Sequence, residues 1–203
     1  MLFLLAACTG TNPDSGPCVS YQAVVTDIDE TLTTSDGEWV SQMADATYDP
    51  EMRSEANTLM SAYAAQGYGV FYVTARGDDF QLSDGRSAWE GTRDWLVAHD
   101  FPVDEERIYL SDGYGVLGDD AAEYKTEVLS DQAAEGWSHA WAYGNAESDI
   151  TAFLAAGIPN DRVFLVGELA GELEVEPILD EDAYDNHLEA LLPLIEATDC
   201  AGL

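Results

Sequence analysis

The stretch VVTDIDETLTTSD, residues 24–36, sets two aspartates directly after a short apolar run. Asp27 and Asp29 stand two positions apart, and like charges that close push the two pKa values away from each other. One carboxylate can then stay ionised to attack an electrophile or bind a metal, while the other holds or delivers a proton. Alone, such a short string is more often an acidic turn, so its interpretation depends on the rest of the chain.

Apolar runs of strand length alternate with helical segments along the chain. The sequence predicts strands at residues 21–25, 69–76, 107–111, 139–145 and 161–167. It predicts helices at residues 48–68, 85–99, 121–135, 147–157 and 180–197. The first helix is expected to start at Asp49 and Pro50, and the last to be interrupted near Pro193. This alternation predicts an α/β domain with a Rossmann-like, mostly parallel sheet flanked by helices.

Polar side chains follow several of these predicted strands. Asp27 comes after the first, Thr74 after the second, and Asn145 and Asp149 after the fourth. Because ligands of parallel sheets bind beyond the carboxyl ends of the strands, these residues are expected to meet at one edge. The segment between Asp29 and Thr74 has room for one main helix, so no large cap domain is expected over the site.

Lys125 is the only lysine among 203 residues. It stands between the third and fourth predicted strands, in the segment EYKTEV. A compact ammonium at this point would meet a phosphate and offset the carboxylates. Chance retention on a helix surface is the alternative explanation.

Taken together, Asp27-Ile28-Asp29-Glu30-Thr31, Thr74, Lys125 and the segment Gly144–Asp149 resemble the four ordered motifs of the haloacid dehalogenase superfamily. The resemblance implies that Asp27 is a nucleophile that forms a phospho-aspartyl intermediate. It implies that Asp29 is the acid/base and that Thr74 and Lys125 hold the phosphate. Covalent attack divides one difficult hydrolysis into two easier steps.

The same resemblance implies a Mg²⁺ site. The implied ligands are Asp27, the backbone carbonyl of Asp29, and Asp149 directly or through water, with Asn145 assisting. Hard oxygen ligands of this kind suit Mg²⁺, and no His or Cys cluster accompanies them in the sequence.

A narrower resemblance extends over roughly residues 24–173. The segments DIDETLTTSD, GVFYVTAR, EGTRDWL, EYKTEVL, YGNAESDITAF and GIPNDRVFLVGELAGEL are similar to the catalytic LNS2 domain of lipins, the Mg²⁺-dependent phosphatidate phosphatases. The implied substrate is phosphatidate or a related lipid phosphate. One departure is Glu30, which stands where lipins usually have glycine.

Two other functions remain open at this point. An exported acid phosphatase of broad specificity for soluble esters would share the superfamily motifs. Some lipin-like domains resemble modules that bind phosphatidate without cleaving it, although such modules usually lack part of the catalytic set. Arg76 is a further open position, because it can either reach substrate or form a salt bridge among so many carboxylates.

The charge is extreme, with 7 Lys and Arg against 40 Asp and Glu and a formal net charge of −33. Such a surface repels phosphate backbones and anionic lipid head groups, which argues against a nucleic-acid partner and against attraction by basic patches. A solvated, solubilising surface of the kind found in proteins adapted to high salt accounts for the acidity. No protein partner is evident.

The first residues, MLFLLAACTG, resemble the lipobox of bacterial lipoproteins, although no Lys or Arg precedes the apolar run. The expected organisation is a signal segment at 1–7, a flexible tether at 8–20 and a phosphatase domain at 21–203. Cys8 is the expected lipidation site, and Cys18 and Cys200 remain for a disulfide. The protein is therefore expected to be exported and lipid-anchored to a bacterial membrane.

Overall fold

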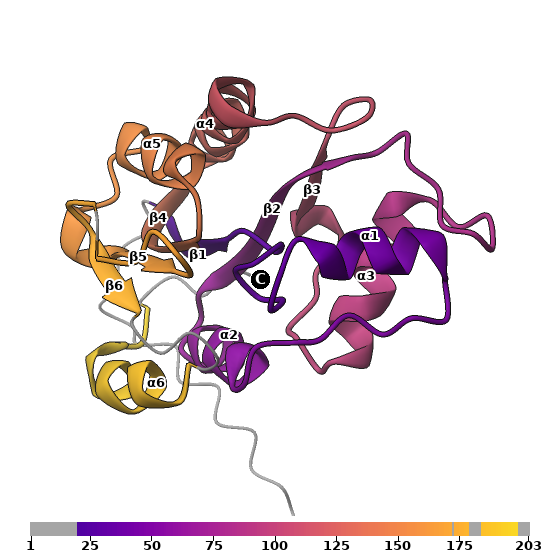
Figure 1. Ribbon diagram of the computed structural model, residues 1–203. Helices are drawn as coiled ribbons and strands as arrows, with labels where there is room; N and C mark the ends of the chain where they lie inside the picture. The colour runs from indigo at the N-terminus through magenta and orange to yellow at the C-terminus, as the bar shows by residue number, and fades with distance from the viewer. Residues whose placement is uncertain (1–19, 172, 179–183, 199–203) are drawn as a thin grey trace, which may run out of the picture.

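The computed structural model describes residues 20–171, 173–178 and 184–198. Within these ranges six parallel strands form one sheet in the order β3-β2-β1-β4-β5-β6 (Figure 1). The strands are β1 (Tyr21–Thr26), β2 (Gly69–Gly77), β3 (Ile108–Ser111), β4 (Trp137–Gly144), β5 (Val163–Val166) and β6 (Glu176–Ile178). Because β1 pairs with β2 on one side and β4 on the other, Asp27 follows an interior strand.

Helices cover both faces of the sheet. The helices of the described residues are α1 (Gly37–Ala44), α2 (Ala56–Ala65), α3 (Ala88–Ala98), α4 (Gly118–Ala134), α5 (Glu147–Ala155) and α6 (Asp185–Leu191), and all but α1 pack on a face. Successive strand residues point to opposite faces, so Val24 joins the core under α2, α3 and α6, and Val25 the core under α4 and α5. Burial on both faces is the usual state of a parallel sheet, and the predicted fold class is confirmed.

The helix expected at residues 48–68 is wrong in its starting point, because α2 begins at Ala56 and not at Pro50. Residues 51–53 are engaged elsewhere, because Arg53 N–H donates at 2.8 Å to the carbonyl of Leu32 in the loop after β1 and not to a preceding turn of helix. The residue that precedes α2 has φ of 63°, a left-handed conformation that interrupts a right-handed helix.

Two short elements were not predicted, α1 and β6. The segment between β1 and β2 therefore carries two helices in place of one. α2 packs on the sheet, while α1 lies beside its carboxyl edge, where the buried ring of Trp39 joins a small apolar cluster (Figure 1). Neither helix forms a large cap domain. The expected interruption near Pro193 is present, because α6 gives way to a 3₁₀ turn at Leu192–Leu194.

The expectations for Cys8, Cys18 and Cys200 concern residues outside the described ranges and stay predictions. The same holds for the signal segment and nearly all of the tether. Along the described parts of the chain, the helices lack the combined length and apolar character that crossing a membrane requires.

Candidate active site

The carboxyl edge of the sheet opens into a cavity of about 710 Å³. The structure brings the predicted catalytic and metal-binding residues to its wall: Asp27, Asp29, Thr74, Lys125, Asn145 and Asp149. They come from the ends of β1 and β4, from β2, and from the helices α4 and α5. Thr74 lies within β2 and not after it, because this strand continues to Gly77.

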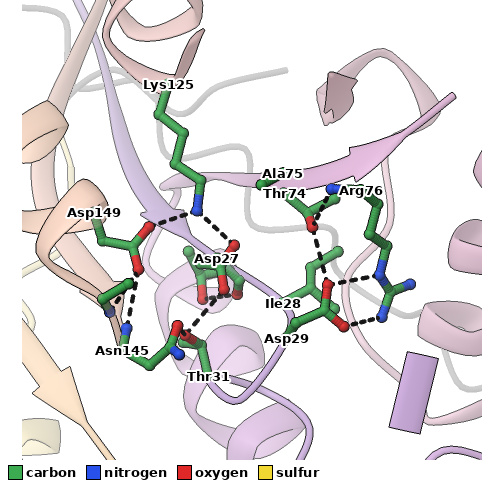
Figure 2. Close-up of polar contacts among 12 residues, drawn as sticks. Asp27, Ile28, Asp29, Thr31, Thr74, Ala75, Arg76, Lys125, Asn145 and Asp149 are labelled. Atoms are coloured by element: carbon green, nitrogen blue, oxygen red, sulfur yellow. Dashed lines mark hydrogen bonds and ion pairs between the residues drawn. The ribbon is translucent and has the colours of Figure 1, made fainter. Parts of the chain in front are cut away.

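A buried ammonium joins two carboxylates at the base of the cavity (Figure 2). Lys125 Nζ donates to Asp27 Oδ1 at 2.7 Å and to Asp149 Oδ1 at 2.5 Å, and the three side chains are at most 6% exposed. Burial works against the charge of Lys125, but Asp149 and Asp27 outweigh it, so its pKa is raised. The retained lysine is therefore a permanent cation of the site, as the sequence predicted, and not a helix-surface residue.

Burial also acts on Asp27. It raises the pKa of this carboxyl to about 7; Lys125 opposes the shift, and the neighbouring charges of Asp149 and Asp29 add to it. The surroundings of Asp27 therefore make its ionised form energetically unfavourable. A cation or an electrophile that reaches Asp27 would relieve that cost.

Asp149 is positioned by the first turn of α5. Its Oδ2 accepts the backbone N–H groups of Asn145 at 3.0 Å and Ala146 at 3.1 Å, in the manner of a capping residue. Gly144 makes room for it, because a Cβ added at this glycine would lie 2.5–2.7 Å from atoms of the Asp149 side chain. The Gly-Asn-x-x-x-Asp pattern therefore has a steric cause.

We expect Gly144→Ala to displace the Asp149 carboxylate and to lower kcat/KM for a phosphate ester by about 10- to 100-fold, because small misplacements of catalytic groups are that costly. The added methyl group also strains a packed site, at about 1–3 kcal/mol of unfolding free energy. Gly37→Ala is the matched control, since its Cβ would meet only Ser35 Oγ at 3.4 Å. Equal activity of the two variants would show that the position of Asp149 is not limiting.

Thr31 is a site residue to which the sequence assigned no role. Its Oγ1 lies 3.2 Å from Asp27 Oδ2 and 3.1 Å from Asn145 Oδ1, so one hydroxyl hydrogen stands between two acceptor oxygens. Asn145 is oriented from its other side by Glu30, whose carboxylate accepts from Asn145 Nδ2 at 3.0 Å. Glu30 has φ of 54°, a left-handed conformation that glycine adopts more readily than glutamate.

Asp29 points away from Lys125 and is held by Arg76 (Figure 2). Arg76 donates from Nε to Asp29 Oδ2 and from Nη2 to Asp29 Oδ1, each at 2.8 Å, and Thr74 Oγ1 donates to Oδ2 at 3.2 Å. The guanidinium is itself fixed by Thr92 and by the ring of Trp39, which lies 4.3 Å below it. Of the two roles left open for Arg76, the structure shows the salt bridge, and the partner is the predicted acid/base.

The described ranges hold no group of three or more His, Cys, Asp or Glu side chains arranged as a ready metal site. The donor chemistry nevertheless fits Mg²⁺. Asp27 and Asn145 each place a hard oxygen next to the Thr31 hydroxyl. The buried carboxylates of Asp27 and Asp149 are offset by the single ammonium of Lys125, which leaves an excess negative charge. A divalent cation there would turn the balance positive and suit a phosphate.

The chain has a haloacid dehalogenase-like fold. Among solved structures, a protein from Mesorhizobium loti described as a HAD-like phosphatase is similar over 87% of both chains, with a TM-score of 0.58 and 17% identity. At that identity the likeness concerns the fold alone.

The family described as "PITM 1-3, LNS2 domain" matches residues 24–167, and the chain belongs to it. Protein retinal degeneration B of Drosophila melanogaster is 30% identical over 173 residues, which cover 84% of this chain. Membrane-associated phosphatidylinositol transfer protein 3 of Mus musculus is 26% identical over 156 residues, or 77% of this chain. The chain spans only 13% and 15% of the lengths of these two relatives.

Proposed function

We propose that this protein is a Mg²⁺-dependent phosphomonoester hydrolase that acts through a phospho-aspartyl intermediate. The observation that carries the proposal is the buried Asp27–Lys125–Asp149 group at the floor of an open cavity. A structural salt bridge has no need of a cavity above it. A nucleophile that must meet a phosphate needs both the cavity and the ammonium.

In the proposed reaction an oxygen of Asp27 attacks the phosphorus, and the ester oxygen leaves with a proton from Asp29. Water then attacks the phosphorus of the intermediate, Asp29 takes a proton from that water, and phosphate is released with Asp27 restored. Lys125 and Thr74 donate to the phosphate oxygens as charge develops. Since both oxygens of Asp29 accept from Arg76 or Thr74, one of these bonds must be exchanged for a bond to the leaving oxygen.

Asp27, the backbone carbonyl of Asp29, Asn145 and Asp149 are the residues proposed to hold Mg²⁺. When bound, the ion supplies charge stabilisation for the transferring phosphoryl group. Both oxygens of Asp149 already accept hydrogen bonds. We therefore propose that Asp149 contributes negative charge to the Mg²⁺ site and binds the ion mainly through water.

Phosphatidate or a related lipid phosphate is the substrate we propose, on the strength of membership in the LNS2 family. A second candidate is a module that binds such a lipid without turnover. Two observations favour it: relatives of this chain are named as phosphatidylinositol transfer proteins, and Asp29 is engaged by Arg76. A soluble-ester phosphatase is the third possibility for the same site.

Phosphate release with and without Mg²⁺ tests these possibilities. The substrates are phosphatidate in mixed micelles, p-nitrophenyl phosphate and nucleoside monophosphates. We expect release chiefly from phosphatidate, falling at least about 100-fold when EDTA removes the ion. Preference for the soluble esters would contradict the lipid substrate, and binding of phosphatidate without any release would contradict the hydrolase.

A further inference from the structure

Three large apolar side chains are exposed at the mouth of the cavity. Val40 on α1 is 59% exposed, and Tyr114 and Leu117 in the β3–α4 loop are 74% and 87% exposed. We call these three residues the apolar rim. They surround a floor made of carboxylates, an amide and an ammonium, so one cavity combines a polar base with an apolar entrance.

The loop that carries two of the rim residues is fixed by its backbone. Gly113 N–H donates to Asp78 Oδ1 at 2.9 Å, and Val116 N–H donates to the carbonyl of Ala75 at 3.2 Å. A Cβ on Gly77 would meet the backbone of this loop at 2.2–2.4 Å, so β2 and the loop are in close contact. The exposed side chains of Tyr114 and Leu117 are therefore presented by an anchored backbone.

Leucine is an unfavourable residue at position 117 for two reasons. It is the residue before α4, the N-cap position, and its side chain caps none of the free N–H groups there. Ser, Thr, Asp or Asn at such a position stabilises a helix by about 1 kcal/mol relative to an apolar residue. It is also the most exposed of the three rim side chains. A local preference broken without a structural gain is the pattern expected of a functional residue.

Tyr114 is held by a neighbour from another loop. Its ring meets that of Phe80 edge to face, with centroids 5.4 Å apart. Both residues line the cavity together with Val40 and Met43 of α1, and Phe80 and Met43 pack against the same small apolar cluster. Apolar side chains from three separate segments therefore converge above the catalytic floor.

We propose that the apolar rim receives the hydrocarbon part of the phosphate ester whose phosphate lies at Asp27 and Lys125. The inference rests on the proposed function and names the residues that select among substrates. A phosphate alone would occupy only part of a cavity of about 710 Å³. An uncharged chain also suits a protein of net charge −33, which repels anionic partners at long range.

A series of linear alkyl phosphates from ethyl to octyl, kept below micelle formation, tests this role on the full chain with Mg²⁺. Burial of each added methylene group is expected to raise kcat/KM by up to about fourfold. In Val40→Ser and Leu117→Ser the increase per methylene is expected to fall by at least half. Serine is a good N-cap, so Leu117→Ser retains α4.

Val97→Ser is the matched control, because Val97 on α3 is 56% exposed and does not line the cavity. It is expected to keep the chain-length dependence of the unmodified protein. Hydrolysis that is independent of chain length, or that changes equally in all three variants, would overturn the role of the rim and leave the hydrolase standing.

Failure of the hydrolase is detected separately. Calorimetric titration of the Asp27→Asn protein with ethyl and octyl phosphate measures the same preference without turnover. Tighter binding of octyl phosphate that is lost in Asp27→Asn/Leu117→Ser supports the rim even if no ester is cleaved. Equal binding of the two esters by both proteins would overturn it.

Discussion

Asp27→Asn is expected to abolish phosphate release while the protein stays folded. Loss of a nucleophile that works together with its neighbours lowers kcat by about 10⁴-fold or more. The amide keeps the shape of the side chain and removes a charge that burial disfavours. The melting temperature at pH 8, above the pKa of about 7 of Asp27, is therefore expected to stay the same or to rise.

The combination of the two measurements is what makes this prediction specific. A lower melting temperature would show that the ion pair of Asp27 with Lys125 stabilises the fold by more than burial of the Asp27 charge costs. Phosphate release that survives in Asp27→Asn would contradict a covalent mechanism with Asp27 as the nucleophile. Asp84→Asn is a suitable control, since Asp84 pairs with Arg86 at the surface and does not line the cavity.

Lys125→Met is expected to have the largest combined effect, on activity and on stability. Methionine fills similar space but leaves Asp27 and Asp149 buried and mutually repelling without a cation. Removal of one partner from a buried ion pair costs about 3–5 kcal/mol. Phosphate release is expected to fall by about 10³-fold or more, because the transferring phosphoryl group loses its ammonium.

The stability loss in Lys125→Met is expected to depend on pH. Burial and Asp149 keep the pKa of Asp27 raised, and removal of Lys125 takes away the charge that opposed this shift. Below that raised pKa the carboxyl binds a proton in the folded protein, so the repulsion is relieved. Denaturant unfolding should show a large loss at pH 8 and a smaller one at pH 5.

A double variant separates charge from packing. In Lys125→Met/Asp27→Asn a neutral amide replaces the carboxylate of Asp27 and no longer repels Asp149. A substantial part of the lost stability is therefore expected to return at pH 8. Activity is not expected to return. Equal losses at both pH values, with no recovery in the double variant, would show that Lys125 acts through packing and not through charge.

Much of the site was predictable because its residues follow strand ends. In a parallel sheet those ends share one edge, so Asp27 and Asn145 were bound to meet if the strands were correct, and Thr74 joins them from three residues before the end of β2. Lys125 was identified by its rarity in the composition and by the resemblance. The structure confirms that these residues share one cavity, and their chemical roles stay proposals.

What the sequence did not give depends on contacts between distant segments. The predicted start of α2 was wrong because residues 51–53 pair with the loop after β1, and this pairing overrides the local signal of Pro50. The pairing of Arg76 with Asp29 and the convergence of Val40 with Leu117 join segments that are far apart in the chain. The periodicity and spacing of residues in a sequence do not predict contacts between distant segments, so these contacts became visible only in the structure.

The most direct test of the account is to trap the intermediate on Asp27. In Asp29→Asn with p-nitrophenyl phosphate and Mg²⁺, the leaving group needs no acid, but water is no longer activated. We expect a burst of about one p-nitrophenol per chain and a hydroxylamine-labile phosphoryl group on the peptide that contains Asp27. A burst without label on that peptide, or label on another residue, would contradict Asp27 as the nucleophile.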